Sequence, residues 1–298
     1  MRPRRRSPVR AWFALVALVL TSCSDAGPAA APGTRTVLDA TGAQVRVPPA
    51  ITRIVTTVPG LTATIEALGA GDLLVAISDQ DPKSGARAAL ARIPVFPIIP
   101  AETLAALHPD LILVDPTLSP RDIAPLRERF PGTFASDSTS LDGLRTTFVR
   151  LGEALGRMAE AKRLTDELDA ARTQARAAGS PTALLLTWAD PPSVIALGPG
   201  SLMHDMLLAV GGRNVASDLG RPSGPIASEV VVERDPAFIV LAGATFSDAL
   251  RSRWSTVRAV REGRVVEAGM DDFMQAGPRT AGALRRLAQL LSPTGATK

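Results

Sequence analysis

The strongest constraint on this chain is a long amphipathic stretch in its middle, from Leu141 to Gly179. Apolar residues recur in it at steps of three and four, and charged residues occupy the opposite face, which predicts a helix with one buried side. Thr139 and Asp142 resemble a capping box at the start, and Gly179 begins the stop signal. At 1.5 Å per residue a single helix would be roughly 55 Å long, enough to join two parts of a fold.

The same pattern also fits a helical hairpin. Gly152 and Gly156 lie inside the stretch, and glycine costs a helix interior about 1 kcal/mol relative to alanine. The distinction matters for movement, because a single packed helix between two lobes permits only small closure. Two separate helices would remove that argument.

Short apolar runs alternate with helical patterns on both sides of this stretch, which is typical of layered α/β folds. We expect strands near 53–58, 74–78, 94–96, 111–114, 183–188, 194–196, 238–241 and 265–268. We expect helices near 62–68, 103–107, 121–129, 202–210, 228–234 and 278–291. The predicted fold is α/β, with two doubly wound, Rossmann-like lobes at 35–140 and 180–298, one connecting helix at 141–179, and a ligand cleft between the lobes.

A shared joint suggests that the two lobes are related halves. In each lobe a predicted helix is joined to the next predicted strand by a short segment whose second residue is proline. The two segments are His108-Pro109-Asp110-Leu111 and Asp235-Pro236-Ala237-Phe238.

The first 23 residues predict an export signal: a basic opening, an apolar run from Ala11 to Leu20, and then Leu20-Thr21-Ser22-Cys23. The run is too short for a permanent membrane span, and the tetrapeptide resembles the lipobox of bacterial lipoproteins. Cys23 is the only cysteine, so lipidation would consume the one thiol. The alternative is an ordinary secretory peptide with an incidental cysteine. Residues 24–34 are small and rich in proline and glycine, which predicts a flexible tether.

Ligands of open α/β sheets gather beyond the carboxyl ends of the strands, so the residues that follow the predicted strands are the candidates for the cleft wall. From these positions and from the helix start after Gly200, we expect ligand contacts from Pro59, Gly60, Asp79, Gln80, Asp115, Trp188, Ser201, His204, Met270, Asp272 and Phe273. For His204 a capping or packing role is the alternative, and Trp188 could equally belong to the core.

Several segments in order resemble the substrate-binding proteins of bacterial ABC importers, in the class with one connecting helix that handles cobalamin, ferric siderophores and haem. The matching segments are residues 62–72, 102–113, 211–216, 228–236, 259–265 and 277–279. The resemblance implies capture of a ligand in the cleft and docking of the loaded protein on a permease dimer, without catalysis and without a cofactor or metal of its own.

By motif position, Glu66 and Glu229 are the residues that the resemblance assigns to docking on permease arginines. The alternative for both is a plain solvated helix glutamate. We expect a monomer in the periplasm or cell envelope, anchored to the membrane by lipid at Cys23.

The ligand is expected to be a metal chelate. Arginine clusters suit anionic chelates, whereas the predicted rim is acidic, at Asp79, Asp81, Asp115, Asp190, Asp271 and Asp272. This favours a cobalamin or other corrinoid first and a neutral ferric siderophore second. A haem receptor of the same family is an alternative, although the chain has no tyrosine to ligate the iron. Met203, Met206, Met270 and Met274 are candidates for adaptable walls or for core filler.

Other functions are disfavoured by what the sequence lacks. Five of the 33 basic residues lie among the first ten, and the other 28 nearly balance the 29 acidic residues, so the folded part has no basic footprint for nucleic acid. Neither GxSxG nor HExxH occurs, and two histidines cannot build a histidine-rich metal site. An enzyme on this scaffold or a purely structural lipoprotein remains as a third alternative.

Overall fold

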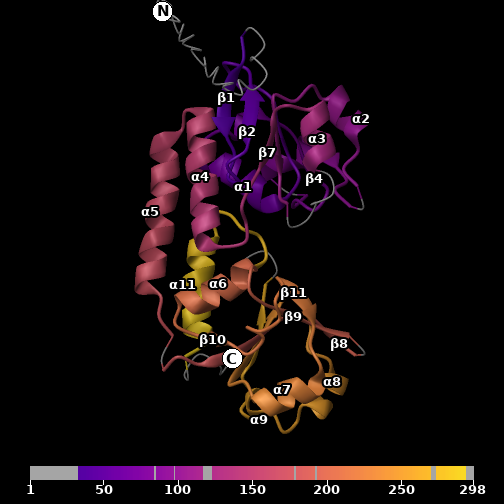
Figure 1. Ribbon diagram of the computed structural model, residues 1–298, viewed down its shortest axis with the longest axis vertical. Helices are drawn as coiled ribbons and strands as arrows, with labels where there is room; N and C mark the ends of the chain where they lie inside the picture. The colour runs from indigo at the N-terminus through magenta and orange to yellow at the C-terminus, as the bar shows by residue number, and fades with distance from the viewer. Residues whose placement is uncertain are drawn as a thin grey trace, which may run out of the picture.

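The computed structural model describes residues 33–83, 85–96, 98–116, 123–177, 179–191, 193–269 and 273–292. Two α/β lobes follow one another along the long axis of the molecule, with α4 and α5 beside them (Figure 1). The predicted signal sequence, Cys23 and most of the predicted tether lie outside the described residues. Within the described part, no helix combines the length and the apolar character needed to cross a membrane.

The N-terminal lobe holds a five-stranded parallel sheet in the order β5-β4-β3-β6-β7. Its strands are β3 (Ile54–Thr56), β4 (Leu74–Ser78), β5 (Ala91–Ile93), β6 (Leu111–Val114) and β7 (Thr133–Ala135). The helices are α1 (Pro59–Ala67), α2 (Ala101–Ala106) and α3 (Ile123–Arg129), with 3-10 turns at Gly71–Leu73 and Gly85–Ala89. A hairpin of β1 (Arg35–Leu38) and β2 (Gln44–Val47) precedes the sheet.

Both faces of this sheet are buried, which explains its nearly continuous apolar strands. Ile54 and Leu111 pack with helices α1 and α4 in one core, whereas Val55 and Ile112 pack with α2 and α3 in another. The predicted strand at 94–96 was wrong. Pairing ends at Ile93 because Pro94 has no amide hydrogen to donate.

The C-terminal lobe has a six-stranded sheet in the order β11-β9-β8-β12-β13, and β10 also pairs with β8. Its strands are β8 (Thr182–Asp190), β9 (Ser193–Leu197), β10 (Arg213–Asn214), β11 (Ser223–Pro225), β12 (Phe238–Ala242) and β13 (Val265–Ala268). The helices are α6 (Leu202–Ala209), α7 (Ser228–Arg234), α8 (Asp248–Arg253), α9 (Arg258–Arg261) and α11 (Thr280–Leu290). Because β9 and β11 run antiparallel to their neighbours, this sheet is mixed, whereas that of the first lobe is all parallel.

The two joints that suggested related halves have the same backbone geometry. His108 and Asp235 both adopt a left-handed conformation, with φ of 45° and 38°, immediately before the proline that leads into β6 or β12. These strands are also equivalent in the sheets, since β6 lies beside the central β3 and β12 beside the central β8. His108 therefore occupies the position that ends α2, as Asp235 does for α7.

The prediction of one connecting helix was wrong, and the helical hairpin is the observed structure. Helix α4 (Leu141–Leu155) ends at Gly156, which has φ of 68°, and α5 (Met158–Gln174) runs back beside it. Gly152 makes their close approach possible, because a Cβ there would lie 2.5 Å from the Cβ of Ala161. Gly156 therefore ends α4, and Gly152 leaves room for α5 to pack against it.

A single hydrophobic core nevertheless connects the lobes. It runs from the first sheet at Ile54 through Phe148 of α4 and Leu164 of α5 to Leu185 of β8 and Leu284 of α11. Interfaces of this continuous apolar kind restrict relative movement of domains. The expectation of small closure therefore stands on the shared core rather than on one rigid helix.

Candidate ligand-binding cleft

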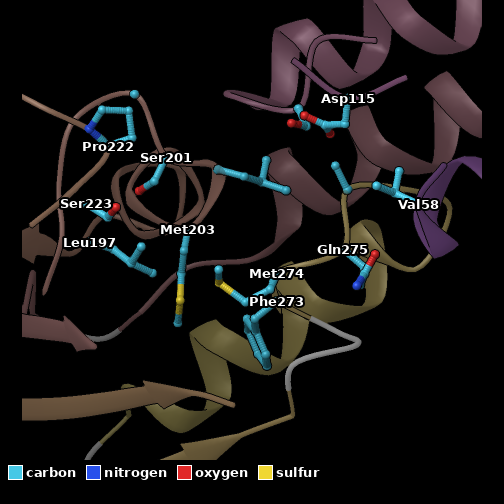
Figure 2. A pocket seen from close by; sticks show the side chains of 14 residues that line it. Val58, Asp115, Leu197, Ser201, Met203, Pro222, Ser223, Phe273, Met274 and Gln275 are labelled. Atoms are coloured by element: carbon cyan, nitrogen blue, oxygen red, sulfur yellow. The ribbon is translucent and has the colours of Figure 1, made fainter. Parts of the chain in front are cut away.

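A cleft of about 240 Å³ lies between the lobes, and residues from both lobes line it (Figure 2). The lining residues are Val58, Asp115, Ser138, Leu197, Gly200, Ser201, Leu202, Met203, Pro222, Ser223, Phe273, Met274, Gln275 and Ala276. The side chains of Met203, Met274 and Phe273 lie across the cleft from Asp115 and Val58 (Figure 2).

The wall of the N-terminal lobe comes from the carboxyl ends of three parallel strands. Val58 follows β3, Asp115 follows β6 and Ser138 follows β7, so neighbouring strands deliver these residues to one edge of the sheet. Asp115 is nearly buried, with 6% of its surface exposed. A carboxylate therefore stands in an otherwise largely apolar wall.

The wall of the C-terminal lobe is built around the start of α6. Gly200 has φ of 87°, a conformation that favours glycine, and it turns the chain into the helix. The Ser201 hydroxyl accepts a hydrogen bond from the His204 amide (3.3 Å) and donates one to the Gly198 carbonyl (2.8 Å). This hydroxyl caps the helix, while Leu202 and Met203 turn apolar surface to the cleft.

The segment before α11 closes the third side of the cleft. The Gly60 amide, at the start of α1, donates to Oε1 of Gln275 at 3.3 Å. A second interlobe bond joins the Leu141 amide of α4 to Oδ2 of Asp205 in α6 at 2.8 Å. Two hydrogen bonds from backbone amides to side-chain oxygens thus join the lobes.

The described lining is mainly apolar, contains one carboxylate and contains no lysine or arginine. Such a surface binds an apolar face and orients it by a few hydrogen bonds. Among the described residues, no group of three or more histidine, cysteine, aspartate or glutamate side chains could hold a metal ion.

The structure brings only some of the predicted ligand-contact residues to the cleft. Asp115, Ser201 and Phe273 line it. Gly60 lies at the adjacent interlobe seam, Pro59 before it is buried outside the lining, and Asp79 and Gln80 are exposed after β4, also outside the lining. Met270 and Asp272 lie outside the described residues.

Trp188 lies in a different hollow, of about 430 Å³, together with Asp190 and Thr245 at the ends of β8 and β12. Its side chain is 55% exposed, so the core alternative for this residue was wrong.

Of the four carboxylates of the predicted acidic rim that the structure describes, only Asp115 lines the cleft, while Asp271 and Asp272 lie outside the described residues. Asp81 is buried, where it accepts hydrogen bonds from Thr62 (3.0 Å) and Arg87 (3.1 Å). Burial raises the pKa of Asp81, although both partners oppose that shift.

His204 points into its own lobe and does not line the cleft. Its Nδ1 lies 3.0 Å from Nδ2 of Asn214, which also donates to the Leu197 carbonyl at 2.8 Å. Burial lowers the pKa of His204, and the nearby Asp205 opposes this shift. The neutral ring therefore accepts from Asn214, which is the packing role.

This geometry predicts an acid-sensitive contribution of His204 to stability. Because its pKa in the folded state lies below the ordinary 6.5, the unfolded chain binds the proton more readily. The free energy of unfolding should fall as the pH drops below about 6.5, and His204→Gln should remove that part of the decline. Urea denaturation of the parent and of His204→Gln at pH 7.5 and pH 5 measures this change in the free energy of unfolding. An equal decrease in both proteins would contradict the packing role.

The two predicted docking glutamates differ in their surroundings. Glu66 on α1 is bound by Arg87, whose Nε donates to Oε1 at 2.8 Å, and its side chain remains 36% exposed. Glu229 is exposed on α7 and makes no ion pair with the described residues. Neither residue lines the cleft.

Several lining residues were missed by sequence reasoning. Pro222 and Ser223 belong to a proline- and glycine-rich segment that resembles a surface loop, and they reach the cleft because β11 pairs with β9. Gln275 and Ala276 lie just before Gly277-Pro278. These two residues signal the start of the last helix, but they do not indicate that the preceding residues line the cleft.

Comparisons with known proteins agree with this architecture. The sequence model of the family described as periplasmic binding protein matches residues 54–271. The substrate-binding lipoprotein YvrC of Bacillus subtilis, named as an uncharacterized ABC transporter protein, is 23% identical over 87% of this chain and 85% of its own. The vitamin B12-binding protein of Vibrio cholerae is 26% identical over 80% of this chain and 88% of its own. The solved periplasmic heme-binding protein RhuT of Roseiflexus sp. RS-1 has a TM-score of 0.71 and 25% identity, covering 83% of this chain and all of RhuT.

Proposed function

The chain belongs to the periplasmic binding protein family, in the branch that serves ABC importers, and from this premise we propose that it captures a metal chelate in the interlobe cleft and delivers it to a permease. Its relatives are solute-binding proteins of transporters rather than enzymes. The observation that carries the proposal is the cleft itself, which both lobes line with apolar side chains and without a cation among the described residues.

A cobalamin or related corrinoid is our first candidate for the ligand. At about 240 Å³ the cleft is smaller than the roughly 300–1,000 Å³ of an ordinary ligand site, so a large chelate would extend beyond it. Phe96 (81% exposed) follows β5, and Trp188 (55% exposed) lies two residues before the end of β8, near the carboxyl edges of the two sheets. Exposed aromatic rings at these edges suit the flat faces of a macrocycle.

The start of α6 suits one further feature of a corrinoid, its phosphate group. The amides of Leu202 and Met203 begin the helix and have no acceptor within it. Such amides, together with the positive end of the helix dipole, favour a bound anion. The rest of the cleft would then contact the neutral macrocycle.

Haem is the second candidate. The chain has no tyrosine, and His204 is engaged with Asn214. The thioethers of Met203 and Met274 line the cleft and are the available soft ligands for haem iron. A neutral ferric siderophore is a third candidate, for which the lining without cations is equally suitable.

We also propose the route by which the protein works. The signal sequence directs export, Cys23 carries the lipid anchor and the monomer acts at the cell envelope, as the lipobox suggests. Glu66 and Glu229 then dock on permease arginines. At Glu66 a permease arginine would compete with Arg87, whereas Glu229 has no such partner among the described residues.

The ligand is tested by titrating the chain from Ser24 onward with cyanocobalamin, haem and a panel of neutral ferric siderophores. This chain contains two tryptophans, of which Trp254 is fully buried and Trp188 is half exposed. One chelate class should quench fluorescence saturably and, at 100-fold excess over Kd, stabilise the fold by roughly 2.7 kcal/mol.

Trp188→Phe is the matched control for this titration. It should lower the quenching, because only Trp254 remains as a fluorophore, while the thermal stabilisation by the same chelate persists. Absence of stabilisation by every chelate would contradict the proposed function.

A further inference from the structure

Three arginines help to line a further cavity in the C-terminal lobe, which shares no lining residue with the cleft. We name it the basic hollow. It measures about 270 Å³ and is lined by Gly179, Ser180, Pro181, Thr182, Arg213, Ala237, Phe238, Arg258, Arg264 and Leu291. Thr182 and Phe238 begin β8 and β12, so the hollow lies at the amino edge of the sheet. By contrast, the cleft residue Phe273 follows the carboxyl end of β13.

Two of the three arginines have no carboxylate partner for their side chains among the described residues. The Arg213 backbone amide donates to the Pro181 carbonyl (2.9 Å), and its exposed side chain makes no hydrogen bond or ion pair with the described residues. Nε of Arg258 is buried without a hydrogen-bond partner, and its Nη2 reaches only Oγ1 of Thr182, at 3.5 Å.

The nearby acidic side chains are already engaged. Glu262 binds Nη1 of Arg264 at 2.7 Å, while the Arg264 guanidinium also lies 5.4 Å from the centre of the Phe238 ring. Oδ1 of Asp235 accepts the backbone amide of Arg258 at 2.6 Å, which satisfies the start of α9 rather than the guanidinium. The donors of Arg213 and Arg258 therefore remain available to a ligand.

We propose that the basic hollow binds a phosphate-like dianion, either free phosphate, a small phosphate ester or a phospholipid headgroup. Guanidinium groups present forked donors that match the oxygens of phosphate, and a buried nitrogen without a partner gains most from such an acceptor. The cavity is large enough for a phosphate with a small organic group. The site is independent of the cleft, so chelate binding should not depend on it.

Isothermal titration of the purified protein with inorganic phosphate and with glycerol phosphate, in buffer free of other oxyanions, tests this proposal. The protein should bind one equivalent saturably, and Arg213→Gln combined with Arg258→Gln should weaken binding at least tenfold. Arg258→Lys keeps the charge without the fork and should give an intermediate loss. The matched control is Arg253→Gln, which removes an exposed arginine of α8 outside the hollow and should change nothing.

The source of the phosphate is distinguished by sedimentation with phosphatidylglycerol vesicles. Sedimentation that the double variant loses and Arg253→Gln retains would assign a lipid headgroup, whereas titration alone would assign a small soluble phosphate. Circular dichroism and thermal unfolding must show that each variant is folded. No saturable binding in any arm, or equal weakening by Arg253→Gln, would overturn the proposal.

Discussion

Reversing both docking charges, with Glu66→Lys and Glu229→Lys in one protein, is expected to reduce ligand uptake by cells to background and to leave ligand affinity unchanged. The two carboxylates lie on different lobes, on α1 and α7, so together they would orient the protein on the permease. Like charges opposite permease arginines suppress both encounter and docking. Neither residue lines the cleft, which is why binding of the chelate should survive.

The matched control is Glu128→Lys combined with Glu267→Lys. Glu128 and Glu267 are exposed, lie on different lobes, and make no ion pair with the described residues. Their replacement by lysine changes the net charge by the same amount as the Glu66 and Glu229 double substitution. Uptake should be normal in this control. Because Glu66→Lys also places a cation beside Arg87, thermal unfolding must accompany the assay. Intact transport by the Glu66 and Glu229 double variant would refute the docking role.

The second large effect is expected from Gly60→Ala, which should destabilise the protein and weaken ligand binding. A Cβ at position 60 would lie 2.2 Å from the backbone oxygen of Ala276, closer than any real contact. Because the clashing atom belongs to the backbone, α1 or the segment before α11 must move. This movement should lower the free energy of unfolding by about 1–3 kcal/mol. That movement would also break the hydrogen bond from Gly60 to Gln275 at the cleft.

Gly282→Ala is the control with the same chemical change. Gly282 lies in α11, is exposed, and a Cβ there would meet nothing within 4 Å. This variant should be more stable than the parent by roughly 0.5–1 kcal/mol, because alanine is the better helix former. Urea denaturation and chelate titration measure both proteins. Equal stability of Gly60→Ala and the parent would show that the interlobe seam is not tightly packed.

Much of the fold follows from local patterns. The apolar runs at β4, β6, β12 and β13 predict these strands to within a residue. The connection between the lobes could not be predicted in this way, because an apolar stripe with a period of 3.6 is the same for one helix and for two helices that turn back on each other. Gly156 is the residue that distinguishes the two cases, since it adopts the left-handed conformation that ends α4.

The site was predictable only where a cleft residue directly follows a strand, as Asp115 does. Ser223 and Gln275 reach the cleft through pairing and packing between segments far apart in the sequence, which no local pattern encodes. Polar side chains were misassigned for a related reason. Asp81 was predicted at the acidic rim and His204 as a ligand contact because they are polar residues near strand or helix ends, yet Arg87 and Asn214 engage them inside the lobes.

The most direct test of the central role is whether a chelate travels with the protein through gel filtration. The chain from Ser24 onward, mixed with cyanocobalamin, haem or ferric siderophores, should retain one chelate in a one-to-one ratio, read from absorbance at the protein peak. Ser223→Trp, which places an indole in the cleft, should elute without it. A protein peak free of every chelate, or equal retention by Ser223→Trp, would contradict capture in the interlobe cleft.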